Sequence, residues 1–283
     1  MLEINGLVKK YKDFTLDCSM KVRRGCITGL VGENGAGKST SFKAALGLIS
    51  YDSGDIKLMG KSPSELREAE KEKIGVTLAE SGFSGYLKVR DIVPVMAAMY
   101  PGFDRERFLN LCRRFSIPQD KYIKEFSTGM KAKLKVLVAV THNADFLLLD
   151  EPTTGLDVTA RESILDLFRG YMEEDESRSI LISSHISSDL EGLCDDIYII
   201  HEGKIVLHED MDNLLNEYGL IKADDGQYAR LDKEHILSVR RTPFGYECLT
   251  DQKGYYRENY PDIVVENGSL DEAITMMTGG ERL

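Results

Sequence analysis

A glycine-rich segment near the N-terminus holds the residues whose type and spacing point most clearly to chemistry. Residues 32–39 read Gly-Glu-Asn-Gly-Ala-Gly-Lys-Ser, which matches the phosphate-binding pattern G-x-x-x-x-G-K-[ST]. The glycines let backbone N–H groups surround phosphates, and a helix that starts after the loop favours anions. In this pattern Lys38 contacts the β and γ phosphates and the Ser39 hydroxyl ligates Mg²⁺. The candidate nucleotide-binding residues of the loop are Gly32, Asn34, Gly35, Ala36, Gly37, Lys38, Ser39 and Thr40.

Two adjacent acids end an apolar stretch in the second half of the chain. Residues 146–151 read Phe-Leu-Leu-Leu-Asp-Glu, the pattern of a buried strand that ends in two carboxylates. In a nucleotide hydrolase this arrangement places one carboxylate near Mg²⁺ and the next beside the γ-phosphate. We therefore expect Asp150 to hold the metal through water and Glu151 to act as the general base. A glycine turn without a ligand and an ordinary acidic loop are the alternatives, and finding both patterns in one chain disfavours them.

The elements that flank the phosphate loop have the pattern that its chemistry requires. Residues 26–31 form a mostly apolar run that is typical of a buried strand, and the loop follows it at once. From Lys38, the apolar residues Phe42, Ala45, Leu46 and Ile49 recur on one side of a helix until residues 52–54 break the pattern. The segment is predicted to be strand, loop and helix.

Similar strand-like runs return later in the chain. They lie at residues 145–150, 179–183 and 197–201, with helical segments between them, an alternation typical of a parallel sheet. Glu202 and Gly203 are expected to turn a hairpin after the last run. Residues 84–124 differ, because Met, Leu, Phe and Arg recur there at helical spacing and predict a helical insert.

The C-terminal part of the chain is rich in aromatic residues and has its own pattern. A hairpin is predicted between residues 236–241 and 246–251. Ser269 and Glu272 have capping-box spacing ahead of a short apolar helix. We interpret residues 219–283 as a small accessory α+β domain.

Composition limits the classes of protein to consider. With 283 residues, of which 42% are hydrophobic, the chain is long enough for one large domain and an appendage. Its formal net charge of −11 disfavours nucleic acid as a general surface partner, because phosphate binding needs clustered Lys and Arg. The five cysteines are scattered and include no C-x-x-C pair, which predicts neither a disulfide framework nor a zinc site and fits the reducing cytosol.

The sequence shows no segment expected to enter a membrane by itself. Residues 1–6 lack the basic region and apolar stretch of a signal peptide. The longest apolar stretches, such as residues 134–140, are far shorter than the ~20 residues that span a bilayer. Any membrane role is therefore expected to depend on a partner.

The segment before the acidic strand carries a resemblance to a known family. Residues 126–130 read Phe-Ser-Thr-Gly-Met and resemble the L-S-G-G-Q signature of the ATP-binding-cassette (ABC) family. Ser127 and Gly129 match its Ser and its second Gly, whereas the other three positions differ. A hydroxyl and bare N–H groups at a helix start suit a γ-phosphate, although an ordinary Ser helix cap is the alternative.

Two further family elements follow in the expected order. Residues 153–157, Thr-Thr-Gly-Leu-Asp, resemble the D-loop, in which Asp157 would help to align two subunits. Residues 183–185, Ser-Ser-His, resemble the switch histidine, which implies that His185 hydrogen-bonds the γ-phosphate. A lone His is more often an ordinary surface or core residue, but this one ends a predicted strand at the position that the family fold implies.

Two candidate residues are weaker matches. Tyr11 lies where the family carries an aromatic that stacks on adenine, although Phe14 is nearby and an exposed strand tyrosine is the alternative. Glu80 occupies the place of the family's Q-loop glutamine; its carboxylate could accept from metal-bound water, but its charge would disfavour ATP nearby. The lysines of residues 131–135 are interpreted as a solvated helix face without chemistry.

The resemblance implies a fold and an activity. The fold is α/β, a P-loop NTPase with a RecA-like core, an antiparallel β-subdomain and a helical subdomain at about residues 84–130, all within an ABC ATPase domain of residues 1–218. The small C-terminal extension follows it. Two subunits would bind two ATP molecules with Mg²⁺ between them and hydrolyse ATP to ADP and phosphate.

The resemblance also implies partners and a location. They are a second copy of the chain or a homologous subunit, and separate transmembrane permease subunits at the cytoplasmic face of the cell membrane. The chain looks like the subunits of bacterial ABC-2-type, multidrug or antimicrobial-peptide exporters. An importer subunit and a soluble ABC ATPase that acts on ribosomes or DNA are the alternatives.

Overall fold

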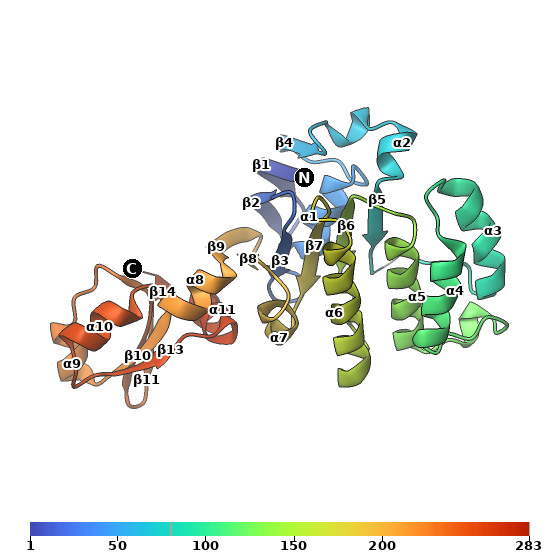
Figure 1. The fold of residues 1–283 in the computed structure, drawn as a ribbon. Helices are drawn as coiled ribbons and strands as arrows, with labels where there is room; N and C mark the ends of the chain where they lie inside the picture. Colours follow the sequence, from blue (N-terminus) through green and yellow to red (C-terminus); the bar gives the residue numbers. More distant parts are fainter. Residues whose placement is uncertain (80, 283) are drawn as a thin grey trace.

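The computed structural model describes residues 1–79 and 81–282, which fold around two separate sheets (Figure 1). The first sheet has nine strands in the order β4-β1-β2-β9-β8-β3-β7-β6-β5. These strands are β1 (Leu2–Lys10), β2 (Thr15–Val22), β3 (Ile27–Val31), β4 (Ser53–Leu58), β5 (Ile74–Thr77), β6 (Phe146–Asp150), β7 (Ser179–Ser184), β8 (Asp196–His201) and β9 (Lys204–Asp210).

The parallel part of this sheet sets the position of the candidate site. Strands β5, β6, β7, β3 and β8 run parallel, and their buried residues read as continuous apolar runs. Asp150 at the end of β6 is paired with Ser183 in β7, and Val31 at the end of β3 is paired with Ser184. The loops after β3, β6 and β7 therefore leave the same edge of the sheet.

An antiparallel part flanks the parallel strands. Strand β1 pairs with β2 and β4, and the alternating burial along β2 leaves one face exposed. Strands β8 and β9 form the hairpin expected at Glu202 and Gly203. The predicted α/β fold with an antiparallel β-subdomain is confirmed.

Most of the helices belong to the first region. They are α1 (Lys38–Ala45), α2 (Glu68–Lys71), α3 (Val89–Met99), α4 (Arg105–Arg114), α5 (Thr128–Val140), α6 (Val158–Glu173), α7 (Ser187–Glu191) and α8 (Met211–Glu217), with 3₁₀ turns at Pro63–Glu65 and Ile123–Glu125. Helices α3, α4 and α5 lie together beside β5 (Figure 1). None of the helices in the described part of the chain is long and apolar enough to cross a membrane.

Helix α1 corrects one sequence-based prediction. Its apolar spacing predicted a helix that continues to Ile49, but the helix ends at Ala45. Gly47 has a φ of 68°, a left-handed conformation that ends a helix and that glycine adopts without a steric cost. Ile49 still packs against the core from the loop.

The second sheet has five antiparallel strands in the order β13-β10-β12-β11-β14. Its elements are β10 (Gly219–Ala223), α9 (Asp225–Arg230), β11 (Ile236–Thr242), β12 (Gly245–Thr250), α10 (Lys253–Asn259), β13 (Val264–Asn267), α11 (Leu270–Gly279) and β14 (Glu281–Arg282). The β11–β12 hairpin and the Ser269–Glu272 capping box match the sequence prediction.

The two regions share part of their core. One apolar cluster contains the fully buried Phe108, Leu147 and Leu190 of the first region together with Leu270 and Met276 of α11. A separate cluster beneath the second sheet contains Ile221, Cys248 and Tyr256. The C-terminal region therefore has a small core of its own and is also packed against the first region.

Candidate functional site

The phosphate loop lies between β3 and α1, as its sequence predicts. The N–H groups at the start of α1 have no side-chain cap, and Gly37 precedes them with a φ of 115°. A Cβ at Gly37 would lie 2.9 Å from Leu16, so any side chain there would be both strained and crowded. Asn34 and Gly35 are exposed, whereas Ser39 and Thr40 are half-buried at the helix start. The loop thus offers open backbone donors at the sheet edge.

Lys38 turns back into the loop that carries it. Its side chain is only 5% exposed, and its Nζ donates to Gly32 O at 2.5 Å and to Glu33 O at 3.1 Å. The same Nζ lies 3.2 Å from Oε1 of Glu151. The structure therefore brings the predicted phosphate ligand and the predicted general base into direct contact.

Asp150 and Glu151 are held by a serine of the neighbouring strand. Ser183 Oγ donates to Asp150 Oδ1 at 2.7 Å and accepts the Glu151 N–H at 3.0 Å. Asp150 is buried, and its Oδ2 has no hydrogen-bond partner among the described residues. Glu151 has a φ of 51°, a left-handed conformation that costs about 1–3 kcal/mol for a residue with a side chain.

His185 completes a cluster around Glu151. Its Nδ1 lies 2.6 Å from Glu151 Oε2, and the Thr154 hydroxyl donates to the same oxygen at 3.0 Å. Burial alone would raise the pKa of Glu151, but the His185 hydrogen bond and the Lys38 ammonium outweigh it and hold the pKa below its ordinary value. The carboxylate is thus ionised and faces two groups that could also contact a phosphate.

The remaining family candidates lie near the surface. Ser127 caps α5, where its Oγ accepts the Met130 N–H at 3.2 Å, and Asp157 caps α6 by accepting the Ala160 N–H at 2.8 Å. A Cβ at Gly129 would lie 2.9 Å from Gly155 O, so the start of α5 touches the 153–157 loop. No described contact joins Ser127 to the phosphate loop of the same chain.

Tyr11 and Phe14 are the two candidates for the aromatic that stacks on adenine. Tyr11 is 49% exposed, and its ring centroid lies 6.3 Å from that of Phe14. Phe14 is the one that approaches the phosphate loop, because a Cβ at Gly37 would lie 3.2 Å from its ring. Both aromatics therefore stay candidates for stacking on a base. Glu80, the candidate at the Q-loop position, lies outside the described residues.

Two residues of this region were missed from the sequence. Ser183 was noted only as a neighbour of the histidine, and its bridge between Asp150 and Glu151 depends on strand pairing. Lys135 was interpreted as solvated, which is wrong: it is half-buried, and its Nζ donates to Leu78 O at 3.0 Å and to Ala79 O at 2.9 Å. Burial lowers the pKa of Lys135. Its spacing on α5 gave no signal of this contact.

A cavity of about 560 Å³ opens beside the site, between α5 and the segment that follows β5. Its lining includes Leu78, Phe83, Ile123, Lys131, Lys135 and Glu151. The walls are thus mainly apolar with lysines among them, and one end reaches the candidate base.

Comparison with known proteins identifies relatives of the chain. The ABC transporter family profile matches residues 16–154. The ATP-binding protein YtrB of Bacillus subtilis is 29% identical over 100% of this chain and 99% of its own length. The lantibiotic transport ATP-binding protein SrtF of Streptococcus pyogenes is 34% identical over 76% of this chain and 93% of its own length.

Solved structures agree with these matches. An ATP-binding subunit of an ABC transporter is 26% identical, with a TM-score of 0.67 over 76% of this chain and 91% of its own. A dimeric ATP-binding cassette bound to ADP and phosphate has the same fold, at 18% identity and a TM-score of 0.66 over 75% of this chain and 99% of its own. On its sequence motifs, its fold and these relatives, the chain belongs to the ABC transporter ATP-binding family.

Proposed function

We propose that this chain binds ATP with Mg²⁺, hydrolyses it to ADP and phosphate, and thereby powers an exporter. The observation that carries the proposal is the cluster in which Glu151 contacts both Lys38 and His185. Glu151 would accept a proton from the attacking water, and Lys38 would exchange its contacts for the β and γ phosphates. His185, which contacts Oε2 of Glu151 whereas Lys38 contacts Oε1, would hydrogen-bond the γ-phosphate.

Mg²⁺ fits the side chains at the end of β6. Asp150 Oδ2 is buried without a partner among the described residues, and the Ser39 hydroxyl lies at the start of α1. Oxygen ligands of this kind suit Mg²⁺. Asp150, through water, and Ser39 would hold the ion, which would neutralise charge on the phosphate oxygens when bound. Glu80 is proposed to contact metal-bound water.

A second copy of the chain, or a homologous subunit, is proposed to complete each site. Ser127, Gly129 and Asp157 lie at the exposed starts of α5 and α6, where they have no contact with the phosphate loop of their own chain among the described residues. A helix start that presents a hydroxyl and N–H groups suits a phosphate. The dimeric cassette of similar fold supports this arrangement.

The cavity between α5 and the segment after β5 is proposed to receive a permease subunit at the cytoplasmic face of the membrane. Its apolar walls and lysines suit an amphipathic helix with acidic residues. Export is the proposed direction; SrtF and the protein BcrA of Bacillus licheniformis are named for lantibiotic and bacitracin transport. The 32% identity to BcrA covers 69% of this chain and 64% of that protein.

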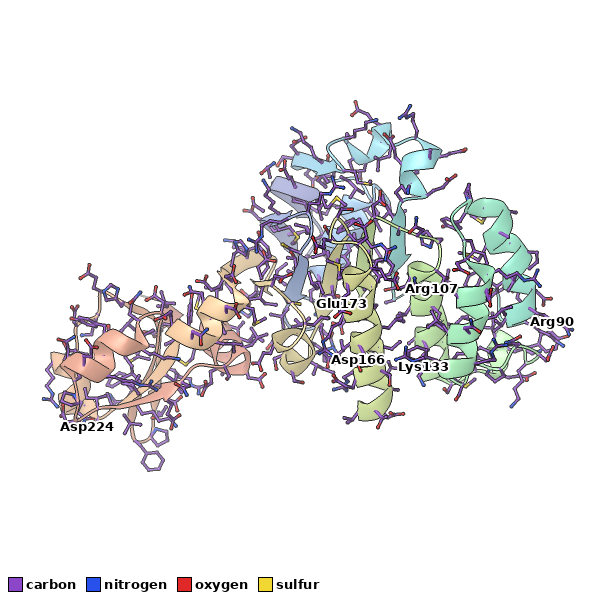
Figure 2. All side chains as sticks on the ribbon, viewed as in Figure 1. Arg90, Arg107, Lys133, Asp166, Glu173 and Asp224 are labelled. Atoms are coloured by element: carbon purple, nitrogen blue, oxygen red, sulfur yellow. The ribbon has the colours of Figure 1, made fainter. Side chains whose placement is uncertain are left out.

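The central test replaces Glu151 with Gln. We expect Glu151→Gln to lower ATP turnover by at least about 100-fold while ATP binding persists, because the amide keeps the shape but cannot accept a proton. The variant should then accumulate as an ATP-bound dimer in size-exclusion chromatography. Glu173→Gln, which makes the same change on the exposed end of α6 (Figure 2), serves as the control. Normal turnover in Glu151→Gln would disprove the base assignment.

Shared sites are tested by mixing two inactive variants. Ser127→Arg and Lys38→Ala should each abolish turnover, since one blocks the partner's site and the other lacks a phosphate ligand. In a mixed dimer one site combines the two intact halves, so activity should return to about half of normal per dimer. Absence of any recovery would contradict the proposed shared sites.

A further inference from the structure

The helix that follows His185 is too short to hold its own position. Helix α7 spans only Ser187–Glu191, and isolated helices of this length are unstable because the cost of nucleation is not recovered. Its place, and with it the direction of the preceding His185, must be fixed by neighbouring elements. Two different neighbours supply the contacts.

The first neighbour is the loop that follows Glu151. Asp189 is 2% exposed, and its Oδ2 accepts the Thr153 hydroxyl at 2.7 Å. Its Oδ1 lies 3.6 Å from Arg161 Nε. Burial raises the pKa of Asp189, and the Thr153 hydrogen bond and the Arg161 cation oppose that rise. Asp189 thus ties the middle of α7 to the segment that begins at the candidate base.

The second neighbour is the C-terminal region, which contacts both ends of α7. Ser187 Oγ donates to Asp271 Oδ1 at 2.6 Å, and the Leu270 N–H donates to Glu191 Oε1 at 2.8 Å. Leu270 and Leu190 are both fully buried in one apolar cluster. Helix α11 therefore lies against α7 (Figure 1) and is bonded to its first and last residues.

We infer that the C-terminal region sets the rate of ATP hydrolysis by positioning α7, with Ser187, Asp189 and Glu191 as positioning residues for His185. Bonds at both ends of a five-residue helix fix its rotation as well as its place. Ser187 lies two residues and Glu191 six residues beyond the histidine, so a shift of α7 changes the distance between His185 and Glu151. The inference rests on the proposed role of His185 in hydrolysis.

The test compares two substitutions of Glu191 in the full chain. Glu191→Ala removes the acceptor of the Leu270 N–H, and we expect it to lower kcat about tenfold with the KM for ATP unchanged. Glu191→Gln keeps an oxygen acceptor in place and should retain most of the activity. Ser187→Ala, a smaller change at the other end of α7, should also lower kcat. Agreement between the two variants would show that the loss of activity does not come from misfolding of one of them.

A matched control changes the C-terminal region away from α7. Asp225 is 71% exposed and pairs with Arg241 of β11; it begins α9, which lies at the far end of this region (Figure 1). Asp225→Ala should leave kcat unchanged. Equal losses in Asp225→Ala and Glu191→Ala would overturn the inference, because the effect would not depend on α7.

Repeating the Glu191→Ala substitution in the His185→Ala variant separates this inference from the proposed function. In His185→Ala, Glu191→Ala should cause no further loss, because its effect passes through the missing histidine. A further tenfold loss there would overturn the inference, as would wild-type kcat in both Glu191→Ala and Ser187→Ala. Wild-type turnover in His185→Ala itself would instead overturn the role proposed for the histidine.

Discussion

Charged side chains meet inside the first region of the molecule, whereas in the C-terminal region they pair on its surface. Lys38, at the start of α1, is 5% exposed, and Asp150, at the end of the parallel strand β6, is 3% exposed. In the second sheet, the Lys222–Glu266 pair has both side chains 44% exposed. Parallel strands bring successive loops to one edge, while antiparallel strands alternate their ends, so only the first sheet can gather loop residues in this way.

The tyrosine network of the C-terminal region and the acid at the end of β6 differ in how their polar atoms are satisfied. Tyr256 donates to Asp232 O at 2.7 Å, and the Asp232 N–H donates to Tyr260 Oη at 2.9 Å. In the first region Asp150 Oδ2 has no such partner among the described residues. The unused bonding capacity of Asp150, beside the phosphate loop, thus suits a ligand, whereas the tyrosine hydroxyls bond within their own network; the second region also has one buried oxygen without a partner, Asp251 Oδ1, among the described residues.

The largest expected effect comes from removing one cation in each region. Lys38→Ala should lower ATP turnover by at least about 100-fold, because a preorganised charge on the phosphates is lost. Lys222→Ala removes a surface cation from β10 and should leave turnover unchanged. Steady-state hydrolysis and calorimetric ATP binding measure both. Comparable losses in the two variants would erase the distinction between the regions.

For the free energy of unfolding of the C-terminal region, the large effect is expected from a substitution in the second sheet. Ile221 is fully buried in β10, and Ile221→Ala should lower the free energy of unfolding of the C-terminal region by about 2–4 kcal/mol. Val264→Ala, at a 57% exposed position of β13, should change it by less than about 0.5 kcal/mol. Urea denaturation followed by tyrosine fluorescence gives both values. An equal cost at the two positions would contradict a separate core beneath the second sheet.

A smaller effect is expected from the serine that joins the two acids. Ser183→Ala leaves Asp150 Oδ1 and the Glu151 N–H without this partner, and we expect turnover to fall about tenfold, since an unmade buried hydrogen bond costs about 1–3 kcal/mol. The KM for ATP should change little. Thr250→Val, which removes a buried hydroxyl from β12, is the counterpart and should not change turnover. Unchanged turnover in Ser183→Ala would show that the acids hold their positions without it.

The smallest effect is expected from one hydroxyl in the tyrosine network. Tyr256→Phe removes the hydrogen bond to Asp232 O but keeps the ring, so the free energy of unfolding should fall by about 1 kcal/mol. Turnover should stay normal. A loss of turnover without a loss of stability would mean that this network has a functional role after all.

Much of the site follows from local sequence patterns. The phosphate loop, the acids after β6 and the histidine after β7 each follow a recognisable strand, and the structure brings Lys38, Glu151 and His185 into contact. Patterns of this kind are local in the chain. The apolar period that predicted a helix to Ile49 was equally local, but it gave too little weight to Gly47.

What the sequence did not reveal depends on residues that are distant in the chain. Lys135 holds the backbone of Leu78 and Ala79 from 57 and 56 residues away, and Ser187 meets Asp271 across 84 residues. A single sequence carries no record of such pairings, because Lys, Ser and Asp are ordinary surface residue types and Leu78 and Ala79 take part through their backbone carbonyls. The partner-facing roles of Ser127 and Asp157 likewise rest on the family resemblance, since in this chain both side chains cap helices.

The contact between Lys38 and Glu151 also affects the proton affinity of Glu151 before ATP is bound. While the lysine lies 3.2 Å from the carboxylate, it keeps that carboxylate a weak base. If Lys38 moves to the phosphates as proposed, this stabilisation would be lost and negative charge would come closer, so the proton affinity of Glu151 would rise on ATP binding. By thermodynamic reciprocity, proton binding at Glu151 also favours ATP. On the proposed assignment, Glu151 would become a stronger base only once ATP is bound.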